Sequence, residues 1–167
     1  MARKSPSQCT SRAVRMEAAT YSWLWVVRAY NLCDAVLNER LALLDVRIGE
    51  HEVLANLLRA PGMTQQQLAA RCFAAKSGVS MLITRMEQQT LVQRDADLVD
   101  ARVKRLSLTK KGLKLALATQ EIQIEVVAAM VEHTSDKNIK IVAEAMQHAS
   151  LALEQMLHTR RSTEVGA

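Results

Sequence analysis

The strongest constraint on the fold is a change of sequence period in the middle of the chain, from helical spacing to alternation. Glu50–Arg59 has the apolar spacing of a helix, and the breaker Ala60-Pro61-Gly62 ends it. Thr64 then starts a second helix, because Gln67 three residues later completes a T-x-x-Q capping box. A third helix is predicted over Lys76–Gln89, with apolar residues along one face.

Two short alternating segments follow the third helix. They are Leu91–Arg94 and Val103–Leu108, and the polar residues Asp95–Arg102 between them suit a hairpin loop. Three short helices with a tight turn before the last have helix-turn-helix geometry, and the added hairpin makes a winged helix. We therefore predict a mainly α fold with a small β-hairpin wing.

Long helices are predicted on both sides of this region. Tyr21–Leu44 contains neither Gly nor Pro, and it is apolar over most of its surface. Thr109 caps a helix from Lys110 to about His133, and a final helix spans Asp136–Thr159. A helix that is apolar on most sides needs several neighbours, so packing between subunits is expected. The predicted segments are a flexible basic arm (1–16), an N-terminal dimerisation helix (17–47), a winged helix-turn-helix (48–110), C-terminal dimerisation helices (111–159) and a frayed tail (160–167).

Positive charge is concentrated in two segments. The chain has 22 Lys and Arg residues against 17 Asp and Glu residues, which gives a formal net charge of +5. Residues 1–15 contain four basic residues and no acidic one, and residues 61–111 contain nine basic residues and four acidic ones. This clustering is expected of a protein that binds a polyphosphate, although a solvated protein face gives the same pattern.

Composition and motifs disfavour several other classes of protein. No apolar run reaches the roughly 18–20 residues of a transmembrane helix. Cys9, Cys33 and Cys72 are far apart and form no CxxC, so we expect a cytoplasmic protein without a disulfide or a metal site. Only five aromatic residues are present, which argues against an RNA-binding sheet. Without a phosphate-binding glycine loop, G-x-S-x-G or H-E-x-x-H, we expect neither an enzyme nor a cofactor.

The ordered motifs of the central region resemble those of the multiple antibiotic resistance regulator (MarR) family of winged-helix transcription factors. The most specific match is Asp100-Ala101-Arg102 followed by Leu108-Thr109, the D-x-R of the wing and the L-T that opens the next helix. Pro61–Ala69 and Leu91–Arg94 match the start of the helix-turn-helix and the start of the wing. The resemblance implies a winged helix-turn-helix between dimerisation helices.

The chain departs from the family pattern at three places, which lie in two turns. Thr90 replaces the usual Gly before Leu-Val, so this turn lacks easy access to positive φ. Cys72-Phe73 stands where Leu-Gly is common, and Ala75 stands where a capping Ser is expected. These departures affect local turn geometry and leave the predicted fold unchanged.

The resemblance implies where DNA would be contacted. Arg85, on the outer face of the third helix, is the best candidate to read a guanine, unless it holds a salt bridge instead. Arg102 would enter the minor groove with Asp100 orienting the loop, or the two residues only brace the wing. Arg105 joins the expected phosphate contacts. The candidate DNA-binding residues are Thr64, Gln65, Gln66, Lys76, Ser77, Ser80, Met81, Thr84, Arg85, Arg94, Asp100, Arg102 and Lys104.

The resemblance also implies a homodimer on a pseudo-palindromic operator, with a small aromatic or lipophilic effector between the dimer helices and the winged helix. We expect Cys33 to be an inert thiol, because it does not match the position of the family's redox cysteine. The expected function is a sequence-specific double-stranded DNA-binding transcriptional regulator, most often a repressor in such families. The alternative is a winged-helix protein-interaction or architectural module with weak or lost sequence readout. Candidate pocket residues are Trp23, Trp25, Tyr30, His51 and Met63, although the aromatic residues suit a dimer core as well.

Overall fold

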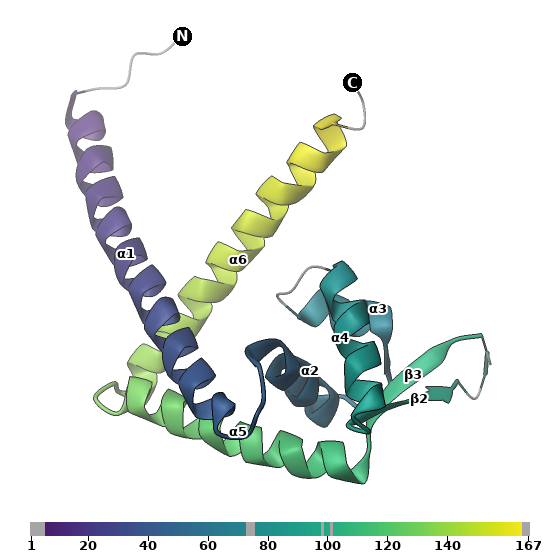
Figure 1. The fold of residues 1–167 in the computed structure, drawn as a ribbon. Coiled ribbons are helices and arrows are strands. Elements are labelled where there is room, and N and C mark those ends of the chain that lie inside the picture. Colours follow the sequence, from purple (N-terminus) through teal and green to yellow (C-terminus); the bar gives the residue numbers. More distant parts are fainter. Residues whose placement is uncertain (1–5, 73–75, 98, 101, 165–167) are drawn as a thin grey trace. The chain divides into compact units, whose positions relative to one another are not determined.

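The computed structural model describes residues 6–72, 76–97, 99–100 and 102–164. The chain divides into two compact units, Met1–Val126 and Val127–Ala167. The predicted mainly α fold with a β-hairpin wing is confirmed (Figure 1). The elements are α1 (Pro6–Ala42), α2 (Ile48–Arg59), β1 (Met63–Thr64), α3 (Gln65–Arg71), α4 (Lys76–Gln88), β2 (Val92–Ala96), β3 (Lys104–Leu108), α5 (Lys110–Val131) and α6 (Asp136–Glu164).

The hydrophobic core of the first unit joins α2, α3 and α4 to the sheet. The apolar face predicted for the third helix, Val79, Ile83 and Met86, is fully buried. It belongs to one cluster with Leu54 of α2 and Leu106 of β3. Because these spacings place all three side chains on one side of α4, its opposite side is left to face solvent.

The sheet is three-stranded and antiparallel, in the order β1-β3-β2. Strands β2 and β3 form the predicted hairpin, with Val92 opposite Leu108. Strand β1 is not predicted by the sequence pattern. Met63 pairs with Leu106, and α3 begins at Gln65 with Thr64 as its N-cap, as predicted. A strand of two residues has no alternation to detect, because it exists only through pairing with a distant segment.

The terminal helices are longer than predicted. Helix α1 begins at Pro6, so the flexible arm expected over residues 1–16 is helical where the structure describes it; the first five residues lie outside the description. Proline is tolerated in the first helical turn, and no Gly or Pro follows it before Gly49. Helix α6 continues to Glu164, so the tail expected to fray from residue 160 is helical to that point, and the last three residues lie outside the description.

In the turn after α4, Thr90 has the backbone conformation that a glycine usually adopts at this position. The Thr90 amide donates to the Glu87 carbonyl (2.8 Å) and the Leu91 amide donates to the Met86 carbonyl (2.9 Å), which is a Schellman cap. Thr90 has a φ of 57°, in the left-handed region. A β-branched residue in this region costs about 1–2 kcal/mol. The missing glycine therefore lowers stability without changing the path of the chain.

Candidate nucleic-acid interface

The first turn of α3 has the predicted capping box. The Gln67 amide donates to the Thr64 hydroxyl (3.2 Å), and the Thr64 amide donates to the Gln67 side-chain oxygen (2.8 Å). Two of the helix's first N–H groups are thus satisfied within the protein. The other two predicted DNA contacts at the start of α3 differ in exposure: Gln65 is half-buried and Gln66 is exposed.

The outer face of α4 carries most of the predicted groove residues. Met81 is 73% exposed, Thr84 is exposed and Ser80 is half-buried. The Thr84 hydroxyl donates to the Ser80 carbonyl (3.1 Å), so it is occupied by the helix itself. Lys76 and Ser77 lie in the first turn of α4, and their side chains lie outside the described part of the chain. The described centre of this face is therefore weakly polar.

Arg85 forms a salt bridge with the buried carboxylate of Glu50 in α2. This is the alternative to guanine recognition that the sequence left open for Arg85. Its Nη2 lies 2.7 Å from Oε1 of Glu50, a residue that is only 5% exposed. The other carboxylate oxygen of Glu50 accepts from the Arg47 amide (2.8 Å) at the start of α2. The Arg85 side chain, 39% exposed, thus joins α4 to α2 in place of presenting a free guanidinium. Glu50 was not predicted as a partner of Arg85, because the two residues are 35 positions apart and no local sequence pattern joins them.

The wing presents one arginine to solvent. The Arg102 side chain is 91% exposed, and its Nε and Nη2 donate to the two carboxylate oxygens of Asp100 at 3.0 and 3.1 Å. The same carboxylate accepts from the Arg102 amide (3.0 Å), and hydrogen bonds from Arg102 lower the pKa of Asp100. The predicted pair therefore forms, with the guanidinium oriented and still accessible to a ligand.

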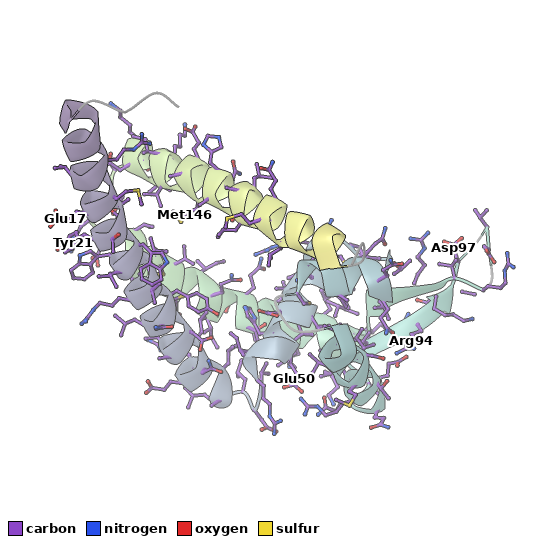
Figure 2. The ribbon with its side chains drawn as sticks, turned by 90° about the horizontal axis from the view of Figure 1, so that it is seen from above. Glu17, Tyr21, Glu50, Arg94, Asp97 and Met146 are labelled. Carbon is purple, nitrogen blue, oxygen red and sulfur yellow. The ribbon has the colours of Figure 1, made fainter. Side chains whose placement is uncertain are left out.

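A second carboxylate organises the base of the wing loop (Figure 2). Asp97 accepts from the Val99 and Asp100 amides at 2.9 and 3.1 Å and from Arg105 Nε at 2.6 Å. Arg105 Nη1 also donates to the Gly62 carbonyl (3.2 Å) before α3. Hydrogen bonds from Val99 and then Arg105 lower the pKa of Asp97 to about 2. Sequence reasoning missed Asp97, although a loop Asp that accepts backbone amides is a common turn signal.

Several basic residues of the central segment are paired inside the protein. Arg94 of β2 lies 3.1 Å from Glu87 of α4, so this predicted phosphate contact has an internal partner. Lys111 donates to the Gln89 carbonyl (2.9 Å), whereas Lys104 is exposed on β3. The central segment therefore keeps its net positive charge, but fewer of its basic side chains are free to contact DNA than the sequence suggests.

A cavity of about 380 Å³ lies in the first unit, on the side of α2 that faces α1. Two residues of the predicted effector pocket, Tyr30 and His51, line this cavity, whereas Trp23 and Trp25 do not. Met63 lines a different hollow, at the turn between α2 and β1. The lining residues are Tyr30, Cys33, Asp34, Leu37, Ile48, His51, Glu52, Ala55, Asn56, Arg59, Arg71 and Gln123.

His51 is the buried polar group of this cavity. It is 4% exposed, and its Nδ1 has no hydrogen-bond partner among the described residues. Burial, and secondarily the positive charge of Arg59, lowers its pKa. The imidazole is therefore neutral at pH 7, with one ring nitrogen left for a ligand.

The described thiols, Cys33 and Cys72, differ in burial. Cys33 is half-buried in the cavity wall. Cys72 is buried, and burial together with the nearby charge of Glu52 raises its pKa to about 11. A raised pKa keeps a thiol protonated and poorly reactive. The side chain of Cys9 lies outside the described part of the chain.

Large apolar side chains are exposed in both units. On α1, Trp25 contacts Tyr21 edge to face, with ring centroids 6.2 Å apart, and Arg28 lies 5.8 Å from the Trp25 ring centre. Figure 2 shows Tyr21 on α1 and Met146 on α6. The exposed side chains of α1 include Tyr21, Trp23, Leu24, Trp25, Val26, Tyr30 and Leu32, and those of α6 include Ile141, Val142, Met146, Leu151, Leu153, Met156 and Leu157.

Two kinds of structural feature are absent from the described residues. They contain no group of three or more His, Cys, Asp or Glu side chains that could hold a metal ion. They also contain no helix with the length and apolar character needed to cross a bilayer.

The chain is similar to known regulators in sequence and in structure. Residues 44–103 match the model of the MarR family. An HTH-type transcriptional regulator of Bacillus anthracis is 29% identical over 90 residues, which span 54% of this chain and only 59% of that relative. The fold matches the transcriptional regulator SlyA with a TM-score of 0.71 at 17% identity, over 80% of this chain and 94% of that one.

A further structural match was solved with nucleic acid. Residues covering 78% of this chain and 96% of the other match MepR of S. aureus in its complex with DNA, with a TM-score of 0.65 and 26% identity. The region matched by the family model includes the capped α3, the helix α4 and the Asp100–Arg102 pair. The chain is therefore similar to MarR family winged helix-turn-helix proteins, with the family model matching its central region, residues 44–103.

Proposed function

We propose that the protein is a sequence-specific transcriptional regulator that binds double-stranded DNA, with α4 in the major groove and the wing in the minor groove. The observation that best supports this is Arg102, which is 91% exposed and oriented by both carboxylate oxygens of Asp100. An oriented arginine suits the negative potential of a narrow minor groove. The similar protein MepR was solved in complex with DNA.

Replacing Arg102 with alanine should weaken operator binding about tenfold or more, because one guanidinium contact in a groove contributes about 1–3 kcal/mol. The measurement is a gel-shift titration with DNA from upstream of the protein's own gene. Two salt concentrations should be compared, since phosphate contacts make affinity fall steeply with salt.

Lys114→Ala is the matched control, because it removes an exposed positive charge from α5, outside the wing. Its affinity should stay within about twofold of the wild type. If Arg102→Ala also binds normally, the Asp100–Arg102 pair only braces the wing. A wild-type protein that binds all DNA sequences equally at low salt would support the architectural alternative.

We further propose that the protein acts as a homodimer. The exposed apolar side chains on α1, and separately those on α6, leave large surfaces that a second copy would cover. Two-fold symmetry then implies two operator half-sites about one helical turn apart. Light scattering should give twice the chain mass of 18.6 kDa; a monomer at micromolar concentration would contradict this proposal.

We also propose that the cavity beside α2 binds a small ligand that relieves repression. Its volume of about 380 Å³ lies in the usual range for small-molecule pockets. The His51 Nδ1 has no partner among the described residues, and Arg59 and Arg71 line the same space. A small aromatic acid with a hydroxyl group would satisfy both, because its carboxylate suits a guanidinium and its hydroxyl can donate or accept.

4-Hydroxybenzoate should therefore raise the melting temperature and weaken operator binding, and benzoate should do so less. His51→Phe should abolish the difference between the two acids, because it removes the ring nitrogen and keeps an aromatic side chain. Calorimetry of each acid with each variant measures this. The titrations should extend to about 10 mM, a concentration that would detect weak binding. If neither acid gives a heat of binding in this range, aromatic acids are not ligands of the cavity.

A further inference from the structure

The middle of α4 exposes an apolar side chain where a groove-reading helix meets its ligand. Met81 is 73% exposed, whereas Val79 and Ile83 on the inner side of the same helix are fully buried. An exposed methionine between such neighbours serves no packing role in the described unit. Its position in the part of the fold that matches the MarR family model makes DNA the relevant occupant.

The neighbouring groups on this face are also apolar or uncharged. Thr84 lies one turn from Met81, and its hydroxyl is engaged with the Ser80 carbonyl (3.1 Å), which leaves its methyl group for external contacts. Gln88 is exposed one turn further on, on the same face. The face therefore offers two apolar groups followed by an amide.

The cation expected on this helix is engaged elsewhere. Among the described side chains of α4, Arg85 is the only positively charged one, and it is bound to the buried Glu50 at 2.7 Å. The described centre of α4 thus has no free guanidinium for the two acceptors of a guanine. An apolar side chain placed over those acceptors would leave them without a partner, which is unfavourable.

Among the four bases, thymine alone carries an apolar group in the major groove, its 5-methyl. Apolar side chains contact this methyl group, and glutamine matches the donor and acceptor of adenine. We propose that Met81 and Thr84 recognise thymine methyl groups, and that the operator half-site carries A·T base pairs beneath the centre of α4. This inference rests on the proposed DNA-binding function and specifies the sequence class that it reads.

The test first selects bound sequences from a random DNA library and then replaces single thymines of the half-site with uracil, which removes only the methyl group. At one or two thymines we expect affinity to fall about fourfold, the effect of one buried methyl group. Uracil at thymines outside the half-site is the DNA control and should leave affinity unchanged. Met81→Ala should bind more weakly and lose its response to uracil at the thymine that Met81 contacts, because this contact is already absent, and it should keep the response at a thymine that Thr84 contacts.

Met81 is exposed, so Met81→Ala should melt at the wild-type temperature, which separates a lost contact from a lost fold. Sequence-selective binding with a G·C-centred half-site, or with no uracil effect, would overturn this inference and leave the proposed function standing. Equal binding to every library sequence would instead overturn the proposed function. A normal uracil response in Met81→Ala would assign the methyl contact to another residue and reject the role of Met81.

Discussion

Replacing Glu50 with alanine should lower the free energy of unfolding by about 3 kcal/mol and the melting temperature by about 10 °C. The Glu50 carboxylate is buried, and it has two partners from different segments. One oxygen accepts from Arg85 (2.7 Å) and the other from the Arg47 amide (2.8 Å). Removing the carboxylate leaves Arg85 partly buried without its counter-charge, and it leaves the start of α2 without a cap.

The Arg85 side chain is partly exposed, so the expected loss lies at the lower end of the range for broken buried pairs. Glu50→Gln keeps the side-chain shape and one acceptor oxygen, and it should lose less stability than Glu50→Ala. Glu121→Ala, an exposed change on α5, is the control and should stay within about 0.5 kcal/mol of the wild type. Urea unfolding of all four proteins measures these differences. A loss below about 1 kcal/mol in Glu50→Ala would show that the pair adds little to the fold.

Features set by neighbouring residues were predictable from the sequence. The spacing of Val79, Ile83 and Met86 identified the buried face of α4, because helical geometry brings such residues to one side. The Thr64–Gln67 capping box formed as predicted, because its two bonds join residues three apart. The hairpin also followed from local alternation and a polar loop.

Features set by contacts between distant segments were not predictable. Arg85 has the spacing of an outward groove residue, and only the fold reveals that Glu50 lies within reach of it. Strand β1 exists because Met63 meets Leu106, which no local pattern indicates. For the candidate site, the wing pair could be predicted from a motif within three residues. The cavity lining could not, because it joins residues from separate helices that are distant in sequence.

Gly112 is a residue whose role depends on such a distant contact. It lies in the first turn of α5, directly beneath the backbone of Leu91. The Thr109 amide donates to the Leu91 carbonyl (3.1 Å), and the Thr109 hydroxyl donates to the Thr90 carbonyl (2.5 Å). These bonds hold the helix start against the turn after α4. A Cβ atom on residue 112 would lie 1.9 Å from the Leu91 carbonyl oxygen.

Gly112→Ala should therefore destabilise the protein by about 3 kcal/mol or more, although alanine normally stabilises a helix by about 1 kcal/mol relative to glycine. The colliding atom belongs to the backbone, so relief requires breaking the bond from Thr109. Gly78→Ala is the matched control, since it lies in α4 with nothing within 4 Å of its Cβ position, and it should gain about 0.5–1 kcal/mol. Urea unfolding of both variants under the same conditions gives the comparison. If Gly112→Ala were as stable as Gly78→Ala, α5 could not pack against Leu91 as closely as the structure requires.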